Sequence, residues 1–365
     1  MTDNSSLIEK KLREAAAIGA ILPDDNWLAT LFSLCNLDQP FLNTLYQRAR
    51  SQDAEGPWRA FACVEANHTK RNPDLPKPKL LQDDPLELIK NSDVQLPPFP
   101  AVLSELEQMV RKEDSNVADV ARLVSSDAAL SSFLLRLVNS AFYSFPAKID
   151  TVSRGIVIVG LQPFYLLSTG LLFKDMLAVL PKGTLCSTCF WYHSVATALA
   201  CREIWRKLKQ PDLERMFTVG LLHDIGKLAL ACMLPEAKNY YSYIASYACK
   251  QPFHVLEDNL LAFDHAKFGG LLLRKWNMPV SLIMPILWHH KPQAAKQYQK
   301  EAAALHLANI IAKTLGYSAI PDEVLPLFQN EACEIIKLND KDLLEICNTV
   351  QTEVHETSSV FLHGA

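Results

Sequence analysis

Glycine is scarce in this chain, with only 12 among 365 residues. Because Gly is the residue that most weakens a helix interior after Pro, this scarcity together with many Leu, Ala and Lys favours helices throughout. Uninterrupted apolar runs are also short, and none approaches the roughly 20 residues of a membrane span. The first residues, Met-Thr-Asp-Asn-Ser-Ser, lack the basic-then-apolar order of a secretory signal. We therefore expect a helical protein in the cytoplasm.

Positive charge is not in excess, since 36 Lys and Arg stand against 40 Asp and Glu, for a net charge of -4. This balance argues against a general nucleic-acid binder, which usually carries a concentrated basic surface. The nine cysteines are odd in number and scattered through apolar segments, as expected for reduced thiols rather than a disulfide framework. The length is sufficient for two or three structural units.

Apolar residues recur at helical spacing along most of the chain. Val102, Leu106, Met109 and Val110 form one such face, and Asp127 precedes another helix that it is expected to cap. The β-branched run Ile156–Val159 favours a strand by propensity, but we expect a helix because the run is isolated among helices. Further helices are expected over 190–208, 236–249, 254–275, 280–290 and within 300–350, and a frayed end over 357–365.

The N-terminal part is expected to form a helical extension over 1–67. Leu28, Leu31, Phe32 and Cys35 are spaced i, i+3, i+4, i+7, and Pro40 is placed to open the next helix. Residues 68–80 are polar and contain three prolines, which predicts a linker.

The stretch Gly220-Leu-Leu-His223-Asp224-Ile-Gly226-Lys227 contains a histidine and an aspartate between apolar residues. Burying an ionised carboxylate costs several kcal/mol unless something compensates its charge, on the order of known desolvation penalties. A divalent cation bound by imidazole and carboxylate is one form of compensation. A hydrogen-bonded structural His-Asp pair is the other, and the local sequence is compatible with both.

Five histidines lie in apolar helical settings: His193, His223, His265, His289 and His290. A single histidine of this kind is more often a satisfied core residue than a ligand. Five of them with an aspartate favour a shared polar cavity. The 30 residues from His193 to His223 correspond to about one helix, a connection and a second helix, so antiparallel packing would bring both side chains to one point.

The chain resembles the HDOD family, a signalling relative of the metal-dependent HD phosphohydrolases. The resemblance covers roughly 90–315 and rests on motifs in family order: Leu96-Pro-Pro-Phe-Pro100, Asp127-Ala-Ala-Leu130, Leu134-Leu-Arg-Leu-Val-Asn139-Ser140-Ala-Phe-Tyr143, Ile149 to Gly160-Leu161, Asp264-His265 with Gly269, Trp276 and Pro279, and His289-His290-Lys-Pro292. It implies a two-lobed all-α domain, with an N-terminal lobe over 81–185, an HD-like helical bundle over 186–320, and C-terminal helices and a tail over 321–365. Asn139, Ser140 and Tyr143 would then have structural roles.

The resemblance to HD enzymes also implies a metal-ligand set. His193, His223 and Asp224 match three ligands of the metal shared by all members, and Asn309 stands where those enzymes have a distal aspartate. His265, His289 and His290 match the histidines of a second metal in the dinuclear HD-GYP branch, although no Gly-Tyr-Pro follows His290. The resemblance leaves two alternatives, a divalent metal, with Fe, Mn, Zn, Mg and Ni not distinguished, or no cofactor, and the neutral amide of Asn309 should weaken the binding of a metal.

Two functions follow from these residues. The first is a regulatory, non-catalytic bacterial signalling protein that binds a protein partner or a small nucleotide-like ligand, without membrane or nucleic acid. The alternative is a metal-dependent phosphohydrolase or phosphodiesterase acting on a nucleotide-like substrate. In that case Asp224 would be ligand and base, and Lys227 would hold a phosphate as a point charge.

A single Cys-x-x-Cys motif, Cys186-Ser-Thr-Cys189, precedes His193 by four residues. No second pair and no βαβ pattern accompanies it, so sequence reasoning favours two ordinary helix cysteines over redox or zinc chemistry.

Overall fold

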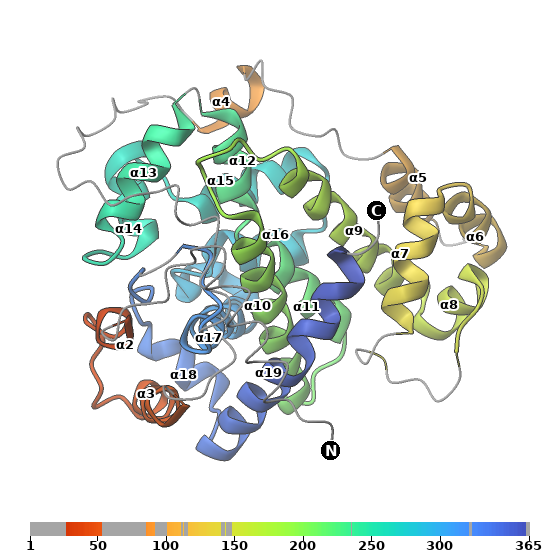
Figure 1. The fold of residues 1–365 in the computed structure, drawn as a ribbon. Coiled ribbons are helices and arrows are strands. Elements are labelled where there is room, and N and C mark those ends of the chain that lie inside the picture. Colours follow the sequence, from red (N-terminus) through yellow and green to blue (C-terminus); the bar gives the residue numbers. More distant parts are fainter. Residues whose placement is uncertain are drawn as a thin grey trace, which may run out of the picture.

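The computed structural model describes residues 27–52, 85–91, 101–110, 112, 116–139, 143, 148–234, 236–320 and 323–362. In this part of the chain every regular element is helical, so the all-α prediction is confirmed (Figure 1). The elements are α2 (Trp27–Leu31), α3 (Pro40–Gln52), α4 (Pro85–Asn91), α5 (Ala101–Val110), α6 (Val117–Ser125), α7 (Ala128–Val138), α8 (Val152–Val159), α9 (Leu161–Ala178), α10 (Ser187–Lys207), α11 (Leu213–Leu222), α12 (Ile225–Met233), α13 (Ala237–Tyr247), α14 (Phe253–Leu261), α15 (His265–Lys275), α16 (Val280–Trp288), the 3-10 helix η3 (Pro292–Tyr298), α17 (Gln299–Thr314), α18 (Asn330–Ile336) and α19 (Asp340–Leu362).

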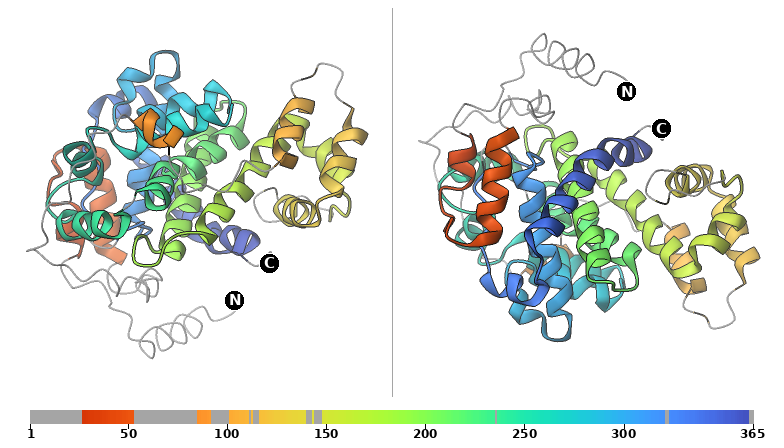
Figure 2. Two further views of the ribbon diagram at one scale, coloured as in Figure 1. Left: turned by 90° about the horizontal axis from the view of Figure 1, so that it is seen from above. Right: turned by 90° about the horizontal axis from the view of Figure 1, so that it is seen from below.

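The helices form two lobes, as predicted. Helices α5 to α8 gather at one end of the molecule, and the larger lobe is built around α10, α11 and α17 (Figures 1 and 2). Helix α9 joins them, because it packs against α5, α7 and α8 in the small lobe and against α11 and α12 in the large one. Helix α9 therefore packs in both lobes. This packing does not test the domain limits expected from the sequence, which stay predictions.

Helix α10 is the central element of the large lobe. Almost every residue from Phe190 to Trp205 is buried, because α11, α17 and α19 surround the helix. A helix that is covered on all sides lies in the interior of a domain. Gly220 of α11 allows the closest approach, since a Cβ at this position would lie 2.6 Å from the Cα of Ala198. The C-terminal end of α11 is thereby brought against the middle of α10.

The segment Leu213–Met233 is long and apolar enough to cross a membrane, and its apolar window is entirely buried inside the fold. A sharply bent pair, Val152–Val159 with Leu161–Gly170, meets the same criteria only when both helices are taken together. Core helices of soluble proteins share this composition.

Several local predictions are confirmed. Ile156–Val159 is helical within α8, and α3 begins at Pro40. Asp127 caps α7 by accepting a hydrogen bond from the backbone N–H of Leu130 at 2.9 Å. Asn139 has the expected structural role, since its amide binds both the N–H and the carbonyl of Ile149, each at 2.7 Å.

Two predicted helix limits are wrong. The expected helix over 254–275 is broken at Ala262, whose φ is 62°, and restarts where Asp264 caps α15 through the N–H of Lys267. The C-terminal residues are helical to Leu362, because Thr357 and Ser358 are buried rather than frayed. By contrast, the helices expected within 300–350 are present as α17, α18 and the first part of α19.

The described part of the N-terminal extension packs on the large lobe. Helix α3 contacts α17, and the N–H of Leu325 donates to the carbonyl of Leu31 at 3.0 Å. Helix α4 is fixed to α15, since Lys275 donates to the carbonyl of Ile89 at 2.9 Å. The predicted linker over 68–80 and Ser140 lie outside the described residues.

The contact between α12 and α15 gives a testable prediction. A Cβ at Gly226 would lie 2.0 Å from the carbonyl oxygen of His265 and 2.8 Å from the nitrogen of Gly269. Because both are backbone atoms, we expect Gly226→Ala to lower the free energy of unfolding by about 3 kcal/mol. Urea unfolding followed by far-UV circular dichroism measures the loss.

Gly155→Ala is the matched control. Its Cβ would have neighbours at 3.8 Å or more, and the position is helical. We expect unchanged stability or a gain of about 0.5–1 kcal/mol, because Ala is the better helix former. An equal loss in both variants would contradict the proposed close contact at Gly226.

Candidate metal centre

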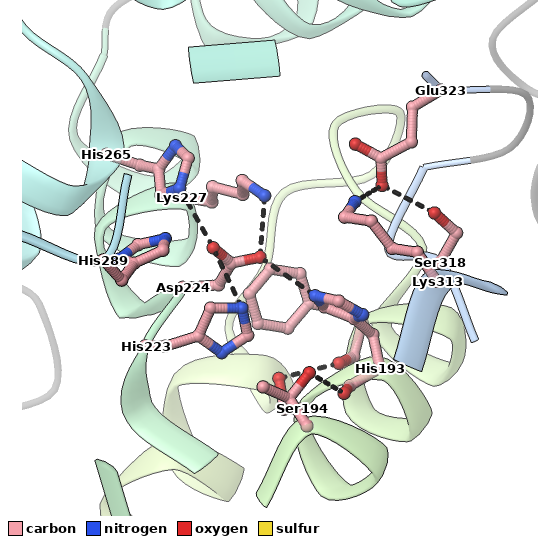
Figure 3. Close-up of polar contacts among 12 residues, drawn as sticks. His193, Ser194, His223, Asp224, Lys227, His265, His289, Lys313, Ser318 and Glu323 are labelled. Carbon is pink, nitrogen blue, oxygen red and sulfur yellow. Dashed lines mark hydrogen bonds and ion pairs between the residues drawn. The ribbon is translucent and has the colours of Figure 1, made fainter. Parts of the chain in front are cut away.

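The carboxylate of Asp224 lies at the meeting point of several imidazoles. Its Oδ2 is 3.4 Å from Nε2 of His193, and its Oδ1 is 3.4 Å from Nε2 of His223 and 3.1 Å from Nε2 of His265 (Figure 3). These side chains come from different elements: His193 from α10, the His223–Asp224 pair from the junction of α11 and α12, and His265 from the first turn of α15. All four are buried, with at most 1% of the side chain exposed.

Two further histidines complete the cluster from the end of α16. The ring centroid of His289 is 5.5 Å from that of His223 and 5.6 Å from that of His265. Nε2 of His290 is 3.1 Å from Nε2 of His265. The candidate ligand atoms form two groups, each within 4.8 Å: His193, His223 and Asp224 in one, and His265, His289 and His290 in the other. The structure thus brings together six of the seven predicted ligands.

Hydrogen bonds at Nδ1 orient four of these rings. Three donate to backbone carbonyls at 2.8 Å: His193 to Tyr317, His223 to Gly220 and His289 to Ile286. His265 donates from Nδ1 to the carboxylate of Glu257. In the neutral rings of His193, His223 and His289, this use of Nδ1–H leaves the lone pair of Nε2 facing the surroundings, as in metal-ligating histidines.

The unsatisfied atoms of the cluster fit a cation. Nε2 of His193, His223 and His289 and Oδ1 of Asn309 are all buried without a hydrogen-bond partner in the part of the chain that is described. Buried acceptors left unpaired cost free energy. Since imidazole nitrogens and carboxylates are ligands of first-row divalent metals, metal ions held by the two groups would satisfy these imidazole nitrogens.

Asn309, the seventh predicted ligand, lies on the face of α17 that is turned toward the cluster. His306, Asn309 and Lys313 are spaced i, i+3, i+7 and therefore share one side of the helix. His306 donates to the carbonyl of His289 at 3.0 Å, which anchors that face. Asn309 is only 2% exposed.

Lys227 neutralises Asp224 within the protein. Its Nζ is 2.7 Å from Oδ2 and lies 4.5 Å from the ring centroid of Phe253, with 2% of the side chain exposed. Burial alone would raise the pKa of Asp224, but His223, Lys227 and His265 outweigh it and hold that pKa well below its ordinary value. Burial opposes the charge of Lys227 too, yet Asp224 raises its pKa. A phosphate contact by Lys227 would require this ion pair to open.

Glu257 is an important residue that sequence reasoning missed. It accepts hydrogen bonds from the backbone N–H of His265 at 2.8 Å, from the His265 ring, and from the hydroxyl of Tyr240 at 3.2 Å. Burial lowers the pKa of His265, but Glu257 and Asp224 together raise it to about 9. One signal was present: Glu257 lies within the apolar stripe of α14 that Phe253, Leu256, Leu260 and Leu261 form at helical spacing.

A second buried ion pair adjoins the cluster. Lys313 of α17 pairs with Glu323, which also accepts from the hydroxyl of Ser318 at 2.6 Å (Figure 3). Burial lowers the pKa of Lys313, although Glu323 opposes this effect. The pKa of Glu323 is also lowered, because Lys313 outweighs the effect of burial, which would raise it. Local patterns gave no sign of this pair, because its members come from a helix and a later loop.

The other buried histidines around the centre are held neutral. Burial lowers the pKa of His223 to about 3 and that of His306 to about 4. Burial and neighbouring histidines lower the pKa values of His254 and His290, whose rings stack at 4.0 Å. Neutral imidazoles keep their nitrogen lone pairs available.

Surface hollows lie elsewhere. A cleft of about 810 Å³ separates α5 and α9 from α15 and α16, and it is lined mainly by apolar residues with Glu107 and Arg274 among them. A smaller one of about 390 Å³ borders Asp212, Arg215 and Glu301. No residue of the histidine cluster lines either hollow.

Comparison with known proteins shows which family this chain is similar to. A family model described as the HDOD domain matches residues 96–292. An uncharacterized protein of Treponema pallidum (strain Nichols) is 24% identical over 269 residues, which are 70% of this chain and 50% of that protein. The chain therefore spans about half the length of this curated relative.

Three solved structures are similar. A protein from Shewanella amazonensis whose name proposes a phosphohydrolase is 27% identical, with a TM-score of 0.58 over 76% of this chain and 97% of that one. An HDOD domain protein of unknown function from Geobacter sulfurreducens is 19% identical, with a TM-score of 0.61 and the same coverage. A protein from Marinobacter aquaeolei, named as a proposed signal transduction protein, is 17% identical, with a TM-score of 0.56 over 94% of this chain and 68% of that one. The last two show likeness of fold alone.

The pair of Glu257 and His265 predicts a pH dependence for metal-free protein. A histidine whose pKa is raised from 6.5 to about 9 contributes stability that is complete below about pH 6.5 and lost as the pH rises through about 9. We expect the free energy of unfolding to fall by about 3 kcal/mol over this range. Urea unfolding in a chelating buffer at several pH values measures it.

Glu257→Gln keeps the size of the side chain but removes its charge, so this alkaline loss should largely disappear. Glu236→Gln, at an exposed position before α13, is the control and should retain the wild-type decline. The same pH dependence in all three proteins would show that Glu257 does not hold a proton on His265.

Proposed function

We propose that this chain, which belongs to the HDOD family, is a regulatory signalling protein whose histidine centre stabilises the fold rather than turning over a substrate. One observation carries the proposal: His193, His223 and Asp224 are completely buried, with 0% of each exposed. Catalytic metal sites keep a position open to water or substrate, whereas structural sites are closed. The protein would then act by binding a signalling partner or a small nucleotide-like ligand in the cytoplasm.

The charges of the centre support this proposal. Lys227 already compensates Asp224 at 2.7 Å, so part of the work that a cation would do is done by the protein itself. The neutral Asn309 takes the place of an acidic ligand. A divalent cation bound here would supply charge compensation and Lewis acidity. His193, His223 and Asp224 would hold it, with Asn309 as a weaker donor.

A second candidate is a metal-dependent phosphohydrolase or phosphodiesterase acting on a nucleotide-like substrate. Two adjacent groups of three candidate ligands favour it, because paired metals assist displacement at phosphorus. The name of the Shewanella amazonensis protein points the same way. The His193, His223 and Asp224 site would have to open before a phosphate could reach it.

Hydrolysis assays separate the two candidates. We expect protein purified without chelator, and then supplied with Mn²⁺, Fe²⁺, Zn²⁺, Mg²⁺ or Ni²⁺, to hydrolyse nucleotides and bis-p-nitrophenyl phosphate no faster than its Asp224→Asn variant. The reason is that the closed centre admits no substrate. Turnover that depends on the metal and is abolished in both Asp224→Asn and His193→Ala would instead establish the hydrolase.

Asn309→Asp tests whether this position faces the metal. A carboxylate is the stronger ligand, so we expect metal affinity to rise roughly tenfold, on the order of the effect of one group near a metal. Competition with a chelating dye measures the affinity, and the thermal shift on adding metal provides a second readout. Asn43→Asp adds the same charge at an exposed position of α3 and should change neither. Equal affinity in both variants would place Asn309 outside the ligand set.

A further inference from the structure

The two cysteines of the Cys186-x-x-Cys189 motif meet at the start of α10. Cys186 is the N-cap of the helix, with an extended backbone at φ −76° and ψ 112°, and its sulfur accepts a hydrogen bond from the N–H of Cys189 at 3.1 Å. The two Sγ atoms are 2.7 Å apart. Both residues are partly exposed, so a small reagent in solution can reach them.

This contact is what sequence reasoning could not foresee. Spacing alone places two cysteines on one side of a helix without bringing their sulfurs together. The extended backbone of the N-cap turns the Cys186 side chain back over the first turn, where Cys189 lies. The arrangement brings the sulfurs within reach of a covalent bond, which requires side chains directed at each other.

We propose that Cys186 and Cys189 form a reversible dithiol–disulfide site, independent of the function proposed above. The position favours the reaction because the N-terminus of a helix carries a partial positive charge that stabilises a thiolate. The thiolate is the species that attacks a disulfide.

A low-molecular-weight disulfide such as oxidised glutathione serves as the oxidant. The Cys186 thiolate attacks one of its sulfurs, forms a mixed disulfide and releases one glutathione thiolate. Cys189 then loses its proton and attacks the Cys186 sulfur, which releases the second glutathione. Two electrons pass from the protein to glutathione, and the two protons end on the glutathione thiols.

The remaining described cysteines do not offer such a pair. Cys201 and Cys347 are buried in helices, and burial raises the pKa values of both thiols. Burial also raises the pKa values of the Cys35, Cys232 and Cys333 thiols to about 11 each. Oxidation should therefore begin at the N-terminus of α10, one turn before His193.

The test uses the full-length chain in glutathione redox buffers, followed by alkylation of free thiols and peptide mapping by mass spectrometry. We expect the protein to lose two thiols per chain as the buffer becomes oxidising, to gain a bond between the Cys186 and Cys189 peptides, and to recover both thiols with dithiothreitol. Cys249→Ser, at a half-buried lone cysteine, should behave as wild type. Cys189→Ser should instead retain glutathione on Cys186.

Three results would overturn the proposal. The first is complete alkylation of both cysteines at every buffer ratio. The second is glutathione on each cysteine without an internal bond, and the third is a bond from either of them to any other cysteine or to a second chain. Because the wild-type protein gives the primary result, the proposal stays testable even if a variant fails to fold.

Discussion

The negative charge of Asp224, buried beyond the reach of water, is the constraint on which the large lobe depends. An isolated carboxylate at this depth would be prohibitively costly, so the surrounding fold must supply compensation. Lys227 does so directly at 2.7 Å, and the imidazoles of His193, His223 and His265 approach from three other directions. His193 comes from α10 and His265 from α15, whereas His223 and Lys227 belong to the same segment as Asp224. Without the charge of Asp224, the electrostatic attraction that holds α10, α12 and α15 together at this point would be lost.

A second layer of polar groups fixes the first. Backbone carbonyls hold His193, His223 and His289 in the orientation that directs Nε2 inward, and Glu257 does the same for His265. The carbonyls of Gly220 and Ile286 are available because α11 and α16 end at the cluster, where the last turn of a helix has carbonyls without an intrahelical partner. The four rings are therefore fixed with Nε2 directed into a buried site, and this closed arrangement supports the regulatory role proposed above.

Close backbone contacts make this convergence feasible. Gly220 lets α11 approach Ala198 of α10, and Gly226 lets α12 approach the backbone at His265. Together they bring the His223–Asp224 junction between two helices that each contribute a histidine. A larger residue at either position would separate the helices that carry the candidate ligands. The two glycines are therefore required for the geometry of the centre.

Local sequence was sufficient for the helical class, for the capping of α7 by Asp127, and for the histidines and aspartate that form the cluster, because helical periodicity and residue chemistry are visible within a few residues. It was not sufficient for the break at Ala262, where the left-handed backbone lets α15 begin at His265. Nor could it reveal Glu257 beneath His265, the Lys313–Glu323 pair, or the contact of the Cys186 and Cys189 sulfurs. Those depend on backbone direction and on the packing of segments that are distant in the chain, and only the tertiary structure decides them.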